Sequence, residues 1–165
     1  MAGHKERQNA MNNKMTVRRL RKPLAASILM ALAACSNAAQ AATYTMFRDP
    51  NCGCCLSWAA HVEEGMGASV TTTNSDDMAA VKTDLGVPAE LRSCHTMEVE
   101  GYVIEGHVPA DAIAQLLSER PEGVSGLAVP GMPVGSPGME FDDRLQPYDV
   151  IAFGPGGQKV FASYP

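Results

Sequence analysis

The stretch Asp49-Pro50-Asn51-Cys52-Gly53-Cys54-Cys55 decides the fold, because it joins a predicted strand to a predicted helix. Residues 43–47 have the apolar and β-branched content of a short buried strand, and the first three residues of the stretch are typical of a turn. Residues 56–64 have helical character, and Gly65 and Gly67 can end that helix. The sequence therefore places three cysteines where a strand meets a helix N-terminus.

The remainder of the chain continues this alternation of strands and helices. The expected elements are a strand at 68–73, a helix at 76–85, strands at 94–99 and 102–104, a helix at 110–119, a Gly- and Pro-rich loop at 121–147 and a hairpin of strands at 148–153 and 159–163. The order strand-helix-strand-helix-strand-strand-helix predicts an α/β fold. We expect a single thioredoxin-like sandwich with a Gly/Pro/Met-rich loop and a C-terminal β-hairpin.

Residues 1–41 differ from the rest in charge and hydropathy. They hold seven of the 13 basic residues and one of the 18 acidic ones, which leaves a formal charge of −11 on residues 42–165. An apolar run at 24–34 follows the basic stretch and is too short for a membrane span, which needs ~20 residues. Together with the small residues at 39–41, these features predict a bacterial export signal that is removed after Ala41.

A lipoprotein signal is the alternative interpretation of the same segment. Leu32-Ala33-Ala34-Cys35 matches the pattern of small residues before a lipidated cysteine, which would anchor the protein through Cys35. Arg18-Arg19 weakly indicates twin-arginine export. We expect a soluble periplasmic protein in preference to the anchored form, without a membrane span and with residues 42–165 as its folded domain. The periplasm is oxidising, so its cysteines are paired with each other or bound to metal.

The composition excludes two classes of protein. With 45% hydrophobic and 19% charged residues, the chain is globular and not largely disordered. The pI near 5.3 and the absence of a basic run in the body of the chain argue against binding to nucleic acid.

Four cysteines remain after residue 41, namely Cys52, Cys54, Cys55 and Cys94. A helix N-terminus favours the thiolate form of the first three, which is the form that binds metal or attacks disulfides. Cys94 begins a predicted strand that can return to this site. Four soft sulfur ligands suit Cu(I), zinc or an iron–sulfur cluster, and the vicinal Cys54 and Cys55 favour a multinuclear cluster over one zinc ion. Two disulfides, for instance Cys52–Cys55 and Cys54–Cys94, are the structural alternative.

Several further residues can contribute to such a site. The thioethers of Met132 and Met139 favour Cu(I). His95 follows Cys94 and can ligate or orient the site, although a solvent-facing strand position is the alternative. His107 precedes the helix at 110–119 and can ligate, or form a hydrogen bond at the helix entry.

The chain resembles the bacterial domain-of-unknown-function family 411, which includes the CopG-type periplasmic copper-resistance proteins. The matching stretches are Asp49-Pro50-Asn51-Cys52-Gly53-Cys54-Cys55, Trp58 with His61, Ser93-Cys94-His95-Thr96, and residues 86–88, 101–110, 117–121 and 126–140. The resemblance implies a thioredoxin-like protein that binds copper, in a multinuclear thiolate cluster, through Cys52, Cys54, Cys55 and Cys94. Met132 and Met139 match family positions and are candidate ligands or gates.

Together these observations predict a periplasmic protein that holds Cu(I) in copper handling and resistance, with Cu(I)/Cu(II) cycling as an additional activity. The expected cofactor is copper, and the expected partners are copper ions and other periplasmic copper-handling proteins. A metal-binding protein is favoured over an enzyme. The alternative is a periplasmic thiol–disulfide oxidoreductase with Cys52 as nucleophile and Cys55 as the resolving thiol. Zinc or iron–sulfur binding is a third interpretation.

Overall fold

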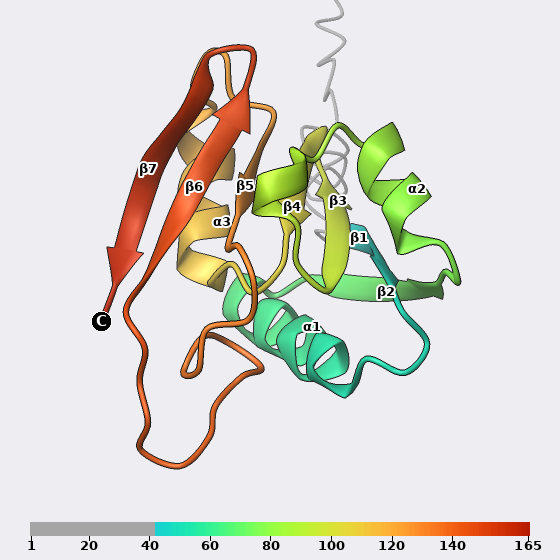
Figure 1. The fold of residues 1–165 in the computed structure, drawn as a ribbon. Coiled ribbons are helices and arrows are strands. Elements are labelled where there is room, and N and C mark those ends of the chain that lie inside the picture. Colours follow the sequence, from blue (N-terminus) through green and yellow to red (C-terminus); the bar gives the residue numbers. More distant parts are fainter. Residues whose placement is uncertain (1–41) are drawn as a thin grey trace, which may run out of the picture. The chain divides into compact units, whose positions relative to one another are not determined.

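The computed structural model describes residues 42–165, and its strands form one mixed sheet in the order β2-β1-β3-β4-β5-β6-β7 (Figure 1). The strands are β1 (Thr43–Arg48), β2 (Ser69–Asn74), β3 (His95–Val99), β4 (Tyr102–Glu105), β5 (Gly126–Ala128), β6 (Tyr148–Gly154) and β7 (Gly157–Tyr164). β1 pairs in parallel with β2 and antiparallel with β3, and β3 pairs antiparallel with β4. The export signal predicted for residues 1–41 lies outside the described residues.

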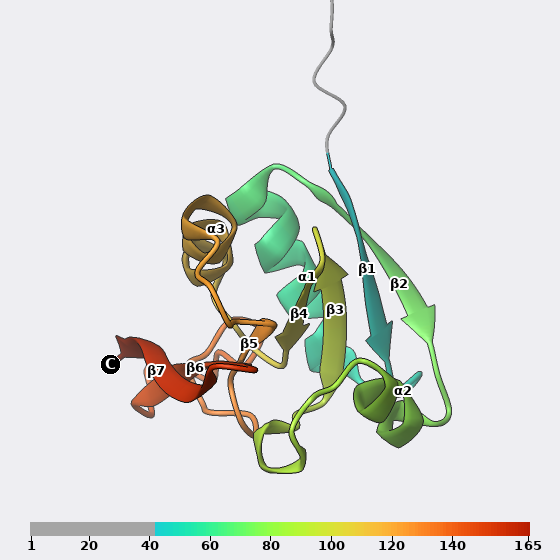
Figure 2. The same ribbon diagram turned by 90° about the horizontal axis from the view of Figure 1, so that it is seen from above.

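Helices cover both faces of the sheet. They are α1 (Gly53–Met66), α2 (Met78–Asp84) and α3 (Ala110–Glu119), with a short 3-10 turn η1 (Ala89–Leu91) after α2. α1 packs against α3 on one face, and α2 packs against β1 and β3 on the other (Figure 2). No helix within residues 42–165 has the length and apolar character needed to cross a bilayer.

The main hydrophobic core lies between the sheet and the pair α1 and α3. Its largest members include Met46 and Met97 from the sheet, Trp58 from α1 and Ile113 from α3, each with no exposed surface. The Trp58 indole Nε1–H donates a hydrogen bond of 2.9 Å to the carbonyl oxygen of Val108, so the polar edge of this buried ring is satisfied. This bond ties α1 to the segment that leads into α3.

The predicted α/β class and C-terminal hairpin are confirmed, α3 has the predicted bounds, and a long loop lies between β5 and β6. The thioredoxin-like assignment stays a prediction. Two local predictions were wrong. α1 begins at Gly53 and not at residue 56, and the predicted loop at 121–147 contains β5. In β5, Gly126 leaves room for the backbone of Val103 on β4, which any side chain at this position would meet.

The long loop between β5 and β6 docks on the first turn of α1. Gly138 has a φ of 80°, and a Cβ atom added there would lie 2.7 Å from the backbone nitrogen of Trp58 and 2.8 Å from the carbonyl oxygen of Cys54. The absence of a side chain at this position therefore lets the loop backbone approach the cysteine motif closely. Figure 1 shows the loop passing beside α1 before it enters β6.

Replacing Gly138 by alanine should loosen this docking. Gly131, in the same loop, is a matched control because its φ is 70° but no atom lies within 4 Å of an added Cβ. We expect Gly131→Ala to lower the free energy of unfolding by about 1 kcal/mol through backbone strain alone. Gly138→Ala should cost a further 1–3 kcal/mol, roughly, through overpacking. Urea unfolding measures both, and equal losses in the two variants would contradict the docking.

Candidate metal centre

A tight turn places the cysteine motif at the start of α1. The backbone N–H of Cys52 donates to the carbonyl oxygen of Asp49 at 3.1 Å, and the N–H of Asn51 donates to the Asp49 carboxylate at 2.7 Å. Cys52 is consequently the N-cap of α1, and Cys54 and Cys55 lie in its first turn. No side chain caps this helix, so its N-terminal partial positive charge is available to stabilise anionic sulfur.

The structure brings the four predicted cysteines together. Their sulfur atoms all lie within 4.8 Å of one another, although Cys94 comes from the segment before β3. Cys52 and Cys55 form a disulfide, with Cα atoms 5.6 Å apart, whereas Cys54 and Cys94 are free thiols. The Cys54 sulfur is 3.4 Å from that of Cys52. Of the two disulfides considered from the sequence, Cys52–Cys55 is therefore present, whereas Cys54 and Cys94 are reduced although their sulfur atoms lie within 4.8 Å of each other.

Two buried histidines lie next to the sulfur atom of Cys94. The Cys94 sulfur lies 3.1 Å from Nδ1 of His95 and 3.1 Å from Nε2 of His107, and these three residues form a second compact set of potential metal ligands. Nδ1 of His107 donates to the carbonyl oxygen of Pro137 at 2.8 Å, which leaves Nε2 as the free acceptor that faces the sulfur. Cys94 is common to both sets.

The solvent-facing alternative for His95 is wrong. Both imidazoles are fully buried, and the ring of His95 lies 4.3 Å from that of Trp58 and 5.1 Å from that of His107, measured between centroids. β3 lies between β1 and β4 and is covered by α1, so its inward-facing side chain has no access to water. Nε2 of His95 is buried and has no hydrogen-bond partner within residues 42–165.

Burial keeps this donor set uncharged. Desolvation, with a smaller contribution from the nearby Cys54 thiol, raises the pKa of Cys94 to about 12. Desolvation also lowers the pKa values of His95 and His107, so both imidazoles are neutral at pH 7. Neutral imidazole is the form that ligates metals, and a metal ion that binds Cys94 must displace the thiol proton.

The remaining sequence candidates lie in different surroundings. Met132 is 52% exposed, and Met139 is half-buried in the loop that docks on α1, where its N–H donates to the carbonyl oxygen of Ser136 at 2.8 Å. His61, which belongs to the family resemblance, accepts a hydrogen bond of 3.1 Å through Nε2 from the N–H of Ala110 and so satisfies a backbone donor at the start of α3. His107, a secondary candidate in the sequence, is central to the site. Its position before Pro109 gave no sign of this proximity.

The arrangement suits two kinds of chemistry. Reduction of the disulfide would provide four thiols beside two neutral imidazoles, which is a soft donor set for Cu(I) or zinc. A disulfide at a helix N-terminus is also the reactive group of thiol–disulfide exchange. The fit to a soft metal rests on this donor chemistry and on the unpartnered Nε2 of His95.

Comparisons with known proteins found one family model and two solved structures that are similar to this chain. Residues 91–139, which include Cys94 and both buried histidines, match the family described as "Protein of unknown function, DUF411". Two solved structures, named "Copper resistance protein copG- Form 1" and "Copper resistance protein copG- Form 2", are each 45% identical to this chain over 76% of its length. The match covers 99% of the first with a TM-score of 0.70, and 100% of the second with a TM-score of 0.71. No curated protein matches the chain.

The raised pKa of Cys94 predicts slow alkylation of the folded, metal-free protein. Only the thiolate reacts, so the rate at Cys94 should rise about tenfold per pH unit from pH 7 to 10 without levelling off. In urea the same thiol should level off above about pH 9, because an unfolded cysteine has an ordinary pKa. Peptide mapping by mass spectrometry after iodoacetamide treatment follows Cys94 alone. Levelling off at the same pH in folded and unfolded protein would contradict the burial argument.

Proposed function

This chain belongs to the CopG-type DUF411 family, and from that membership we propose that it binds copper and acts in copper handling and resistance. The observation that carries the proposal is the convergence of four cysteine sulfurs, from two distant segments, within 4.8 Å. Thiolates are soft ligands that prefer Cu(I). Copper is cargo in this proposal, and the chain's own cysteines and histidines provide its ligands.

We propose that the bound copper forms a multinuclear cluster with bridging sulfurs. Cys54 and Cys55 are neighbours in the first turn of α1, one half-buried and one fully buried, so their sulfurs have different surroundings. Cys94 belongs both to the sulfur set and to the set with His95 and His107. A thiolate shared by two sets can bridge ions that have different additional ligands.

The mixed donor set supports Cu(I)/Cu(II) cycling as part of this proposal. Thiolates favour Cu(I), whereas imidazoles also suit Cu(II), so both oxidation states have ligands here. Oxidation of one Cu(I) would pass one electron to an external acceptor. Met132, which is 52% exposed, offers a thioether to entering Cu(I), and Met139 lies on the loop that covers the motif. We place the protein in the periplasm, where other copper-handling proteins are its expected partners.

The ligand set predicts a loss of copper in cysteine variants. After reduction of the disulfide and anaerobic loading, the wild type should retain several Cu(I) ions per chain, and Cys54→Ser with Cys94→Ser should retain at most one. Elemental analysis after gel filtration measures the ratio. Ser57→Ala, an exposed substitution on the same helix, is the matched control and should bind as the wild type does. Equal loading of the double variant and the wild type would refute the cluster.

The Cys52–Cys55 disulfide favours one alternative function, thiol–disulfide exchange. Once an external dithiol had reduced the disulfide, the half-buried Cys52 would attack a substrate disulfide as thiolate, form a mixed disulfide with one substrate sulfur and release the other substrate sulfur as a thiolate. Cys55 would then attack Cys52, re-forming the disulfide of the protein and releasing the reduced thiol of the substrate. Cys54 and Cys94 have no part in this cycle.

Insulin reduction by metal-free protein separates the two functions. We expect the wild type to reduce insulin no faster than Cys52→Ser does, because copper binding and not exchange is the proposed role. If the wild type reduces insulin, loses this activity in Cys52→Ser and has no measurable Cu(I) affinity, thiol–disulfide exchange replaces copper binding as the proposed function. The absorption spectrum of the purified protein separates zinc and iron–sulfur binding, because zinc adds almost no absorption and iron–sulfur clusters are brown.

A further inference from the structure

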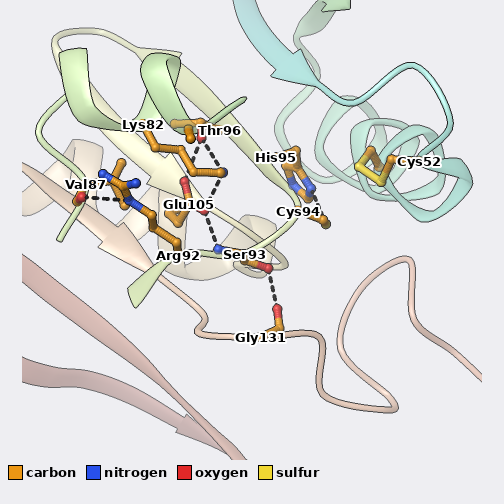
Figure 3. Close-up of polar contacts among 12 residues, drawn as sticks. Cys52, Lys82, Val87, Arg92, Ser93, Cys94, His95, Thr96, Glu105 and Gly131 are labelled. Carbon is orange, nitrogen blue, oxygen red and sulfur yellow. Dashed lines mark hydrogen bonds and ion pairs between the residues drawn. A yellow bond between two sulfur atoms is a disulfide. The ribbon is translucent and has the colours of Figure 1, made fainter. Parts of the chain in front are cut away.

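A buried ion pair lies on the face of the sheet opposite the cysteine motif (Figure 3). Nζ of Lys82, from α2, is 2.6 Å from Oε1 of Glu105, from β4, and the two side chains are 6% and 0% exposed. The hydroxyl of Thr96 donates to the second carboxylate oxygen at 2.6 Å, and Lys82 donates to that hydroxyl at 2.9 Å. The three polar groups satisfy one another away from water.

The same carboxylate holds the backbone next to Cys94. The N–H of Ser93 donates to Oε1 of Glu105 at 2.5 Å, and Ser93 directly precedes Cys94. The Ser93 hydroxyl donates to the carbonyl oxygen of Gly131, so this residue also contacts the long loop (Figure 3). The backbone pairing of β3 with β4 begins with Thr96 opposite Glu105, and Ser93 lies before it. The backbone N–H of Ser93 therefore has no partner on β4, and the Glu105 carboxylate accepts its hydrogen bond instead.

Stability alone does not explain this ion pair. Replacing a buried ion pair by apolar residues of similar volume is often neutral or stabilising, because both charges must be desolvated on folding. β3 and β4 are already paired through their backbones. What the carboxylate adds is a fixed position for the Ser93 backbone, and through it for the Cys94 sulfur, which lies within 3.1 Å of two imidazole nitrogens.

We propose that Glu105, with Lys82 as its counter-ion, is a positioning residue for the copper site. Glu105 lies on the face of the sheet that α2 covers, and it acts by accepting a hydrogen bond from the Ser93 backbone. The side chains of Cys94 and His95 lie on the opposite face, which α1 covers. Within residues 42–165, the carboxylate bonds to Lys82, Ser93 and Thr96 and to none of the potential ligand atoms. This inference rests on the proposed function and adds a specific role for two residues outside the metal centre.

Two neutral double variants test the role of the acceptor at position 105. Lys82→Met with Glu105→Leu removes the charges and the acceptor, whereas Lys82→Met with Glu105→Gln removes the charges but keeps an oxygen for the N–H of Ser93. We expect the leucine pair to bind Cu(I) about tenfold more weakly than the wild type, a typical effect of losing an outer-shell partner. The glutamine pair should keep wild-type affinity. Competition with a chromophoric Cu(I) chelator measures both.

The Cys94→Ser background separates positioning from a general loss of structure. If Glu105 acts through Cys94, adding the leucine pair to the Cys94→Ser variant should not weaken Cu(I) binding any further. Leu116→Ala, which opens a cavity in the hydrophobic core beside α3, controls for lost stability and should leave Cu(I) affinity unchanged. Equal affinity of the leucine pair and the wild type, or an undiminished tenfold loss in the Cys94→Ser background, overturns the positioning role.

Alkylation of metal-free protein at a single pH tests the placement of Cys94 without copper. The thiol should react severalfold faster in the leucine pair than in the wild type or the glutamine pair. Equal rates in all three overturn the inference, even in a protein that binds copper as proposed. Faster alkylation in a protein that binds no Cu(I) would support the positioning role and refute only the proposed function.

Discussion

The antiparallel register between β1 and β3 is the constraint on which the site depends. Arg48, the last residue of β1, pairs with His95, the first residue of β3. The chain that leaves β1 and the chain that enters β3 therefore lie side by side, and the turn after Arg48 carries the cysteine motif while Cys94 precedes His95. Backbone pairing thus brings together sulfurs that lie about 40 positions apart in the sequence. A shift of one residue would also turn His95 to the other face of the sheet.

The two faces of β3 contribute side chains to two different parts of the structure, the cysteine–histidine cluster and the buried Lys82–Glu105 network. Towards α1, His95 packs against Trp58 beside the sulfurs, and towards α2, Thr96 joins the buried network of Lys82 and Glu105. Successive side chains of a strand point to opposite faces, so one short strand contributes to both. The apolar face keeps water away from the buried imidazoles, and on the polar face Glu105 accepts a hydrogen bond from Ser93, the residue before Cys94.

The sequence predicted the parts of this arrangement that local patterns encode. The strand–cysteine–helix junction, α3 and the C-terminal hairpin follow from periodicity, caps and turn residues, and the four cysteines stood out by type and spacing. β5 escaped prediction because its role is tertiary, since Gly126 fits between two strands that are distant in sequence. The pairing of Lys82 with Glu105 was equally hidden, because a lysine on a short helix ordinarily indicates a solvated face.

Charge balance links the metal-free state to the proposed cluster. Four thiolates in a half-buried site would repel one another strongly, and a single Cu(I) would neutralise only one of four negative charges. In the metal-free protein that repulsion is absent, because Cys52 and Cys55 are joined in a disulfide and burial keeps Cys94 protonated. Once the disulfide is reduced and the thiol protons are displaced, several monovalent ions are needed to offset the charge. The same charge repulsion that burial and the disulfide avoid therefore favours a multinuclear cluster over a single bound ion.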